Sequence, residues 1–216
     1  MEIGNQTFNP TDAYPITGTP PAWLQPYLAA TASAQSDDLG TRGRASSTVS
    51  GSTTEYEAVV KLAKWIIDNI TYNGKATADD AVSVLSNRSG KCEGFSNLMI
   101  AFLRSLKIPA RNCVGVVAAG RQDFPSGAFV DYVSAAWHCT YEVYYASPFT
   151  GWKSGDAQTS VHMVSNHNLI YARGLDASVE NSGLITCPYS VPVGDPPPTA
   201  TSPTSVTLKS FSNNSV

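Results

Sequence analysis

The stretch Ser-Gly-Lys-Cys-Glu-Gly-Phe-Ser, residues 89–96, decides the fold, because a turn of small residues leads there into a helix near Cys92. Apolar side chains recur at helical spacing after it, at Phe95, Leu98, Met99, Phe102, Leu103 and Leu106. Lys107-Ile108-Pro109 ends this helix. A thiol at a helix N-terminus faces unpaired N–H groups and the positive end of the helix dipole, which favour thiolate. The position predicts a nucleophile, and a buried structural cysteine is the alternative.

Upstream of this stretch, Ser52-Thr53-Thr54-Glu55 is typical of a capping box, with Ser52 as the cap and Glu55 reaching back. Apolar residues at helical spacing then predict a helix that ends before Asn73-Gly74. A short second helix is expected over residues 77–85. Residues 31–53 are polar, with only sparse apolar positions. We therefore expect the helices in the first half of the chain.

Downstream of the Cys92 helix, alternating and β-branched residues predict strands over 111–119, 137–145, 161–164 and 168–171. Helices first and strands second are typical of an α+β fold. We expect an irregular lead-in or linker at residues 1–22 and one domain over 23–190. The Pro/Thr/Ser-rich residues 191–216 are interpreted as a linker and the possible start of a further β domain. The chain is therefore expected to be part of a larger multidomain protein.

The composition excludes several classes of function. A net charge of −3 in 216 residues gives no basic footprint for nucleic acid. No run of 18 apolar residues predicts a membrane-spanning helix, and residues 1–5 lack a signal-peptide pattern. Only 14% of the residues are charged, and Ser and Thr replace them, which suits an extracellular or cell-surface protein.

Two further residues complete a candidate catalytic set. His138 lies in a predicted strand, where it can act as a general base or be a partly buried histidine bonded to backbone. Asp156 follows Gly151-Trp152 and could orient the distal ring nitrogen of His138, although an Asp in Ser-Gly-Asp is more often a simple turn residue. Together with Cys92 they give the order nucleophile, base, orienting carboxylate.

The motifs around these residues resemble the transglutaminase-like superfamily. Residues 89–96, followed by Leu-Arg-Ser-Leu-Lys-Ile-Pro-Ala-Arg at 103–111, are similar to its cysteine motif, with Lys107 where Gly is usual. Trp-His-Cys-Thr-Tyr-Glu-Val-Tyr at 137–144 resembles its H-x-W-x-E-V-Y strand, with Tyr141 taken as the aromatic residue. Residues 151–156 resemble its G-W-x-x-x-D segment, and residues 65–72 the helix before the cysteine. The resemblance covers roughly residues 55–160.

The resemblance implies a papain-like α+β core, with the catalytic cysteine at a helix N-terminus packed on an antiparallel sheet. It implies Cys92 as nucleophile, His138 as base and then acid, and Asp156 as the orienting group. An oxyanion hole is required, and the Cys92 backbone N–H is one natural donor. Tyr72 is a candidate for the second donor, although a core or strand aromatic is its more common role. Trp137 and Trp152 are expected to pack on the strands and to form the site wall.

No cofactor or metal is expected. His138, His162 and His167 match no standard metal-ligand spacing. The four cysteines, Cys92, Cys113, Cys139 and Cys187, are too scattered for a disulfide framework. Cys113 and Cys139 are both placed on predicted strands, so a disulfide between them stays open in a secreted protein.

The implied activity is thiol-dependent acyl transfer on amide bonds through a Cys-thioester. Hydrolysis by a cysteine peptidase or amidase is favoured over crosslinking, because no EF-hand-like calcium loop is present. The expected partners are protein or peptide substrates, with cell-wall peptides included. The alternative is a non-catalytic peptide-binding or structural module of a cell-surface protein.

Overall fold

The computed structural model describes residues 10–117, 120–123, 129–132, 136–147, 151–159 and 168–177. Its elements, in chain order, are η1 (Ala22–Tyr27), α1 (Leu39–Thr48), α2 (Glu55–Asn69), β1 (Thr71–Tyr72), α3 (Ala81–Asn87), β2 (Ser89–Gly90), α4 (Cys92–Ser105), β3 (Ala110–Val117), β4 (Gly120–Asp123), β5 (Phe129–Tyr132), β6 (Ala136–Tyr145), β7 (Gly151–Gly155) and β8 (Asn168–Gly174). Helices come first and most strands follow. The α+β prediction is therefore confirmed.

The long helices follow the apolar periodicity, but the predicted cap of α2 was wrong by two residues. Thr54 is the N-cap, and its hydroxyl accepts a hydrogen bond from the Glu57 amide at 3.2 Å. Glu57 reaches back to the Thr53 and Thr54 amides. Glu55, the predicted partner, is instead buried in the first turn, where its amide donates to the Asp12 carbonyl. The lead-in chain therefore sets where α2 begins.

Two helices differ from the sequence prediction. Helix α1 was missed, because its buried side chains are only Thr41 and Ala45, and no apolar stripe marks it. Helix α3 begins at Ala81 rather than at residue 77, because the Asp80 carboxylate caps it through the Ser83 amide at 3.1 Å.

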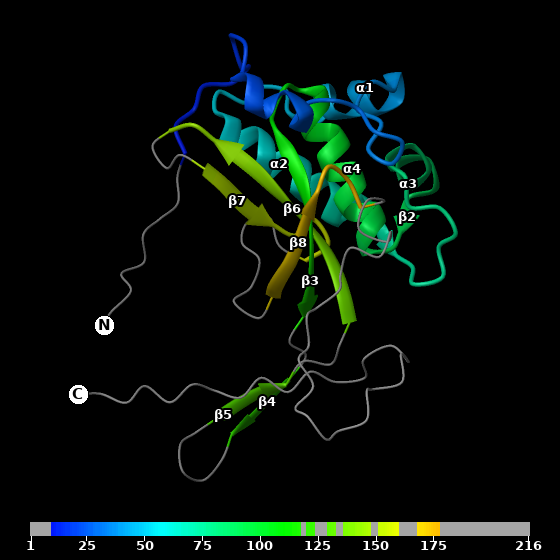
Figure 1. Ribbon diagram of the computed structural model, residues 1–216. Helices are drawn as coiled ribbons and strands as arrows, with labels where there is room; N and C mark the ends of the chain where they lie inside the picture. Colours follow the sequence, from blue (N-terminus) through cyan, green and yellow to red (C-terminus); the bar gives the residue numbers. More distant parts are fainter. Residues whose placement is uncertain are drawn as a thin grey trace, which may run out of the picture.

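The central sheet has the strand order β7-β6-β3-β8, and all three of its pairings are antiparallel (Figure 1). Helix α4 packs on one face of this sheet, across β6 and β3, and α2 and α3 pack on α4. Strands β4 and β5 form a separate pair. The predicted strands 111–119, 137–145 and 168–171 match β3, β6 and β8; residues 161–164 lie outside the described residues.

The core lies between the helices and the sheet. Every residue of α4 from Gly94 to Arg104 is buried. The Arg104 guanidinium is buried. It donates hydrogen bonds to the carbonyls of Ala29 at 2.9 Å and Ala110 at 2.9 Å, and also to that of Leu175. One cation thus fastens α4 to three chain segments that lie far apart in sequence.

The chain before α1 packs on the same body. Tyr14 donates its amide to the Thr53 carbonyl at 2.9 Å, and the Asp12 carboxylate accepts the amides of Ala146 and Ser147 just after β6. The boundaries proposed for residues 1–22, 23–190 and 191–216 remain predictions. Within the described ranges, no helix is long and apolar enough to cross a membrane.

Candidate active site

Cys92 is the first residue of α4, as the sequence predicted. The turn before it is held by Asp79, whose carboxylate accepts the Lys91 amide at 2.9 Å and pairs with the Lys91 ammonium at 2.9 Å. Gly94 has to be glycine in this setting, because an added Cβ would lie 2.7 Å from Val84 and 3.0 Å from the Asp79 carboxylate. The small residues of the motif therefore let α3 and Asp79 press against the first turn of α4.

His138 and Asp156 form the second part of the site. His138 lies on β6, and Asp156 directly follows β7, the neighbouring strand. The His138 Nε2 and Asp156 Oδ2 atoms are 2.8 Å apart, and the two side chains are only 13% and 7% exposed. The Asp156 carboxylate also accepts the Gln158 amide at 2.9 Å and the Thr159 hydroxyl at 2.8 Å. These donors hold Asp156 in place and ionised, and they leave Nδ1 of His138 free of Asp156.

The Cys92 thiol hydrogen-bonds to His138, so the structure brings all three predicted catalytic residues together. Hydrogen bonds from Cys139 and His138 lower the pKa of Cys92 to about 4, against the opposing effect of burial. Burial lowers the pKa of His138, but the hydrogen bonds to Asp156 and Cys92 outweigh it and raise that pKa to about 9. The electrostatics favour a thiolate–imidazolium pair at neutral pH.

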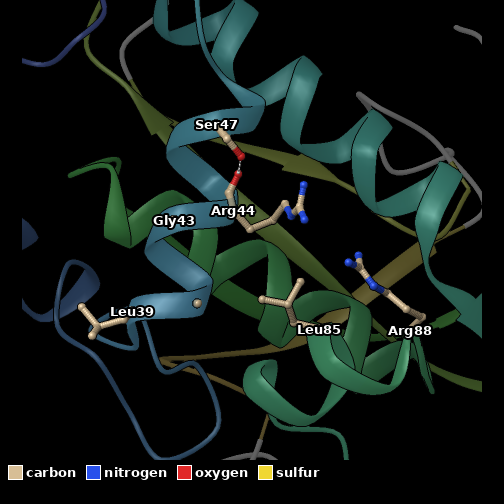
Figure 2. Close-up of a pocket in the computed structure, with 7 residues that line it drawn as sticks. Leu39, Gly43, Arg44, Ser47, Leu85 and Arg88 are labelled. Carbon is tan, nitrogen blue, oxygen red and sulfur yellow. Dashed lines mark hydrogen bonds between the residues drawn. The ribbon is translucent and has the colours of Figure 1, made fainter.

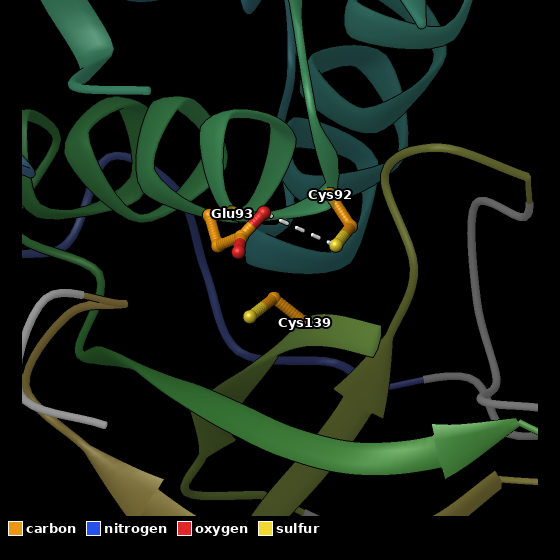
Figure 3. A group of neighbouring side chains, drawn as sticks. All are labelled: Cys92, Glu93 and Cys139. Carbon is orange, nitrogen blue, oxygen red and sulfur yellow. Dashed lines mark hydrogen bonds between the residues drawn. The ribbon is translucent and has the colours of Figure 1, made fainter. Parts of the chain in front are cut away.

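Cys139 is a site residue that the sequence reasoning missed. Strand alternation places it opposite to His138, yet both contact Cys92. The β6–β7 pairing ends at Tyr141 and Gly155, so the β7-side edge of β6 is open at Cys139. The Cys139 amide and thiol both hydrogen-bond to the Cys92 sulfur there. In Figure 3 the Cys139 side chain rises from its strand toward the start of α4.

Glu93, in the first turn of α4, also lies beside the nucleophile. The Cys92 sulfur and Glu93 Oε2 are 3.3 Å apart. Burial, and then the charge of Cys92, raises the pKa of the Glu93 carboxyl above its usual range.

The oxyanion hole expected from the sequence remains a prediction, but its two candidate donors can be located. The Cys92 amide is at N1 of α4, where the helix itself supplies no acceptor. Tyr72 lies on β1, paired with Gly90 two residues before Cys92, and its side chain is 54% exposed. Its hydroxyl lies over Gly74, so its role as second donor remains a prediction.

Trp152, which the sequence predicted to form a site wall, packs in an aromatic cluster instead. Its ring lies 4.8 Å from that of Tyr27 and 5.6 Å from that of Tyr144, under the Arg111 guanidinium at 4.0 Å. These residues belong to the sheet face away from α4, and none of the described contacts joins Trp152 to Cys92 or His138. Trp137 lies on β6 beside His138, opposite Val116.

Tyr141 needs a correction in the strand motif. Counted from His138 and Glu142, the tryptophan of H-x-W-x-E-V-Y falls on Thr140. Tyr141 instead points into the core and fills the space over Gly155, where a side chain would overlap its ring. The glutamate of the motif, Glu142, is a buried ion-pair centre. It binds Arg111 at 2.6 Å and Arg173 at 3.0 Å.

The proposed disulfide between Cys113 and Cys139 does not form. Cys113 pairs with Thr140 and Val114 pairs with Cys139, so the one-residue offset puts the two thiols on opposite faces of the sheet. Cys92, Cys113 and Cys139 are all thiols rather than disulfide partners. Cys187, His162 and His167 lie outside the described residues.

Two cavities lie near the helices. One, of about 270 Å³, is lined by α1 residues including Leu39 and Arg44, by Leu85 of α3, and by Arg88 directly after α3 (Figure 2). Both guanidiniums stack on Trp65, at 5.1 and 4.8 Å, and no catalytic candidate lines this cavity. The other, of about 170 Å³, borders the candidate site through Glu93, Lys91 and Ala177. Its walls also carry Asp79, Asp80 and Asn97.

Comparison with known protein families gives a match that spans the candidate site. The sequence model of the transglutaminase-like superfamily matches residues 42–157, which is more than half of the chain and includes the whole candidate site. Comparison with curated protein sequences gives no significant match.

Among solved structures, the chain is similar to a putative cysteine protease from Cytophaga hutchinsonii. The identity is 25%, the TM-score is 0.58, and the match covers 73% of this chain and 49% of that one. The periplasmic domain of TgpA from Pseudomonas aeruginosa follows at 23% identity and a TM-score of 0.45, over 61% of this chain and 45% of that one. Red sea bream transglutaminase matches at 14% and 0.34, over 54% and 23%. The chain spans about half the length of the Cytophaga protein.

Proposed function

Because the chain belongs to the transglutaminase-like superfamily, whose members carry out thiol-dependent acyl transfer, we propose that it cleaves amide bonds through a thioester on Cys92. The observation that carries the proposal is the continuous chain of hydrogen bonds from Asp156 through His138 to Cys92, with the His138–Asp156 contact at 2.8 Å. Three side chains from three separate elements meet there, at a helix N-terminus.

In the first half-reaction, the Cys92 thiolate attacks the amide carbonyl carbon, and the Cys92 amide donates to the developing oxyanion. The His138 imidazolium then gives its proton to the leaving nitrogen, so the C–N bond breaks and an amine or ammonia departs. Asp156 keeps the imidazole ring oriented and stabilises its charged form.

In the second half-reaction, neutral His138 takes a proton from water, and the resulting hydroxide attacks the thioester. The C–S bond breaks, the carboxylic acid leaves, and Cys92 returns to thiolate beside the imidazolium. If an amine replaces water, the same steps form a new amide. We propose water as the acceptor, with support from the cysteine-protease description of the Cytophaga protein.

The proposed substrates are proteins or peptides, with cell-wall peptides included, and the proposed location is outside the cytoplasm. The low charge and high Ser/Thr content support this location.

Acyl-enzyme trapping tests the reaction. The protein is mixed with a proteome-derived peptide digest, quenched in acid, and the Cys92 peptide is analysed by mass spectrometry. We expect acyl adducts that hydroxylamine removes, together with shortened or deamidated peptides. Cys113→Ala is the matched control, because Cys113 is a buried thiol with no contact to the site. Absence of adducts and products would favour the binding module.

A second arm separates hydrolysis from crosslinking. A fluorescent primary amine is added together with a glutamine-bearing protein, and both ammonia and labelled protein are measured. Ammonia release without label supports hydrolysis. Label on the protein, lost in Cys92→Ala, would contradict the choice of water as acceptor.

A further inference from the structure

No step of the acyl-transfer reaction passes a proton or an acyl group through the Cys139 thiol or the Glu93 carboxylate, yet both point at the nucleophile. The Cys92 sulfur, the Cys139 sulfur and a Glu93 oxygen all lie within 4.8 Å of one another (Figure 3). Cys139 is 7% exposed and packs with Val114 and Ala177, so its position is fixed by the core. Cys92 and Glu93 are held by the first turn of α4.

This arrangement fits the face of a tetrahedral metal site. With Zn–S bonds of about 2.3 Å and Zn–O bonds of about 2.0 Å, the S···S edge is about 3.8 Å and the S···O edge about 3.5 Å. The Cys92 sulfur and the Glu93 oxygen are already 3.3 Å apart, and the remaining edges are at most 4.8 Å. Closing the longest edge needs a side-chain shift of about 1 Å, within rotamer adjustment.

We propose that Cys92, Cys139 and Glu93 form a site for a thiophilic divalent cation of the zinc class, and that its binding switches the nucleophile off. Two sulfurs and one carboxylate oxygen suit Zn²⁺ or Cd²⁺ and disfavour Ca²⁺ and Mg²⁺, which prefer all-oxygen ligands. Three protein ligands leave the fourth position for water.

The surroundings offer a route for the ion. Glu93 lines the cavity of about 170 Å³ beside the site, and Asp79 and Asp80 lie on its wall. Lys91 partly offsets this charge through its ion pair with Asp79. Ala177, which packs against Cys139, lines the same cavity, so the cavity borders the cluster through Glu93 and Ala177.

Binding is a coordination step with no change of oxidation state. The metal forms bonds to both sulfurs and to one Glu93 oxygen, and the Cys139 thiol proton leaves to solvent. The Cys92 lone pair is then shared with the metal and cannot attack a carbonyl. Metal binding stands on the geometry alone, whereas the inhibition rests on the proposed function.

Titration of the reduced protein with CdCl₂ tests the binding, with a phosphine reductant present. The readouts are calorimetric stoichiometry and the thiolate-to-cadmium charge-transfer absorbance. We expect one ion per chain and the band of two thiolates. Cys139→Ser should halve the band and weaken binding by more than the ~10–100-fold that loss of an outer-shell partner costs. Glu93→Gln should weaken binding but keep the two-thiolate band.

Cys113→Ala is again the matched control, and it should bind as the parent protein does. An unchanged band in Cys139→Ser, or equal binding of Mg²⁺, would overturn the proposal. A protein that binds no ZnCl₂ but loses two titratable thiols on exposure to peroxide would also overturn the proposal. Cys92 and Cys139 would then be a redox pair. If Cd²⁺ binds as expected but no acyl-enzyme is found, the proposed function fails and the metal site stands.

Discussion

Strand β6 carries two buried ionic clusters that are built alike and differ in what they can do. At one end, Asp156 accepts hydrogen bonds from His138, Thr159 and the Gln158 amide. Four residues along the strand, Glu142 accepts hydrogen bonds from Arg111 and Arg173. Both carboxylates are about 95% buried, and each forms an ion pair with a basic side chain on a strand of the sheet.

The difference between the clusters is the cation. Arginine stays protonated at any pH at which the protein folds, so Glu142 can anchor strands but cannot pass on a proton. Histidine exchanges its proton near neutral pH, so the Asp156 cluster can act as acid and base. The cysteine beside each cluster also differs in pKa. Burial and the Glu142 charge raise the pKa of Cys113 above its ordinary range, whereas the pKa of Cys92 falls to about 4. Position and partner decide which cysteine is reactive.

The largest expected effect is on catalysis, from Cys92→Ala. Turnover should fall by roughly 10⁴-fold or more, because triad members act as a unit. The free energy of unfolding should change by no more than about 1 kcal/mol, because Cys92 is partly exposed and its removal leaves no large cavity. Steady-state kinetics and urea unfolding check both numbers. A variant that unfolds would show that Cys92 has a structural role, and the distinction between a reactive Cys92 and an unreactive Cys113 would then fail.

The pH profile sharpens the same comparison. The Cys92 thiolate is present above its pKa of about 4, and the His138 imidazolium below its pKa of about 9, so kcat/KM should be bell-shaped between these limits. Outside them the rate should fall about tenfold per pH unit.

Asp156→Asn tests the upper limb of that bell. Asp156 raises the pKa of His138, so its neutralisation should move the alkaline limb to lower pH. Glu142→Gln is the matched control, because it removes a carboxylate of the same strand region that does not contact His138, and both limbs should stay in place. An alkaline limb that is the same in Asp156→Asn and in the parent protein would contradict the role of Asp156.

The largest loss in the free energy of unfolding is expected at the Glu142 cluster rather than at the Asp156 cluster. Glu142→Gln leaves Arg111 and Arg173 without their counter-ion, and the side chains are 17% and 47% exposed. Breaking a buried pair costs about 3–5 kcal/mol, and the exposure of Arg173 reduces this to about 2–3 kcal/mol. Urea unfolding at neutral pH should show this loss, with kcat unchanged per folded molecule.

The same variant predicts an acid dependence. Burial raises the pKa of Glu142, but Arg173 and Arg111 outweigh it and hold that pKa below its usual value. Its stabilisation is therefore present above the unfolded pKa of about 4.3 and is lost as pH falls through the folded pKa. The parent protein and Glu142→Gln should converge in stability at acid pH. A constant difference down to acid pH would argue against the ion pairs as its cause.

Sequence reasoning succeeded where a local pattern carries the information. The 3.6-residue period of α2 and α4 and the alternation of β6 are recorded in the chain itself. It failed where tertiary contacts decide. Helix α1 has no apolar stripe, and the cap of α2 depends on Asp12, which lies more than 40 residues upstream. The two-residue strands β1 and β2 are too short to carry a periodic pattern, and they are recognised only from their pairing with each other.

Some residues of the candidate site could likewise be predicted from local sequence, whereas others are set by tertiary contacts. Cys92 could be found from its place before an amphipathic helix, and His138 and Asp156 from the order of the family motifs. Cys139 could not be found, because strand alternation points it away from His138. Its contact with Cys92 lies beyond the last β6–β7 pair, Tyr141 and Gly155, and no sequence motif marks that end. Thr159 has no motif at all, since its role comes from a turn that closes on Asp156.

Thr159→Val therefore gives the smallest and most specific prediction. The Thr159 hydroxyl donates to Oδ2 of Asp156, the same oxygen that binds His138. A hydrogen bond to a charged group contributes about 1.5–3 kcal/mol, and exposure of Thr159 reduces this to about 1 kcal/mol, so kcat should fall about fivefold with KM unchanged. Thr159→Ser keeps the donor and should keep the activity. If both variants lose activity equally, the methyl group rather than the hydrogen bond matters. If neither does, the backbone amide of Gln158 and His138 alone suffice to hold Asp156, and the reactive cluster is as self-contained as the arginine cluster beside it.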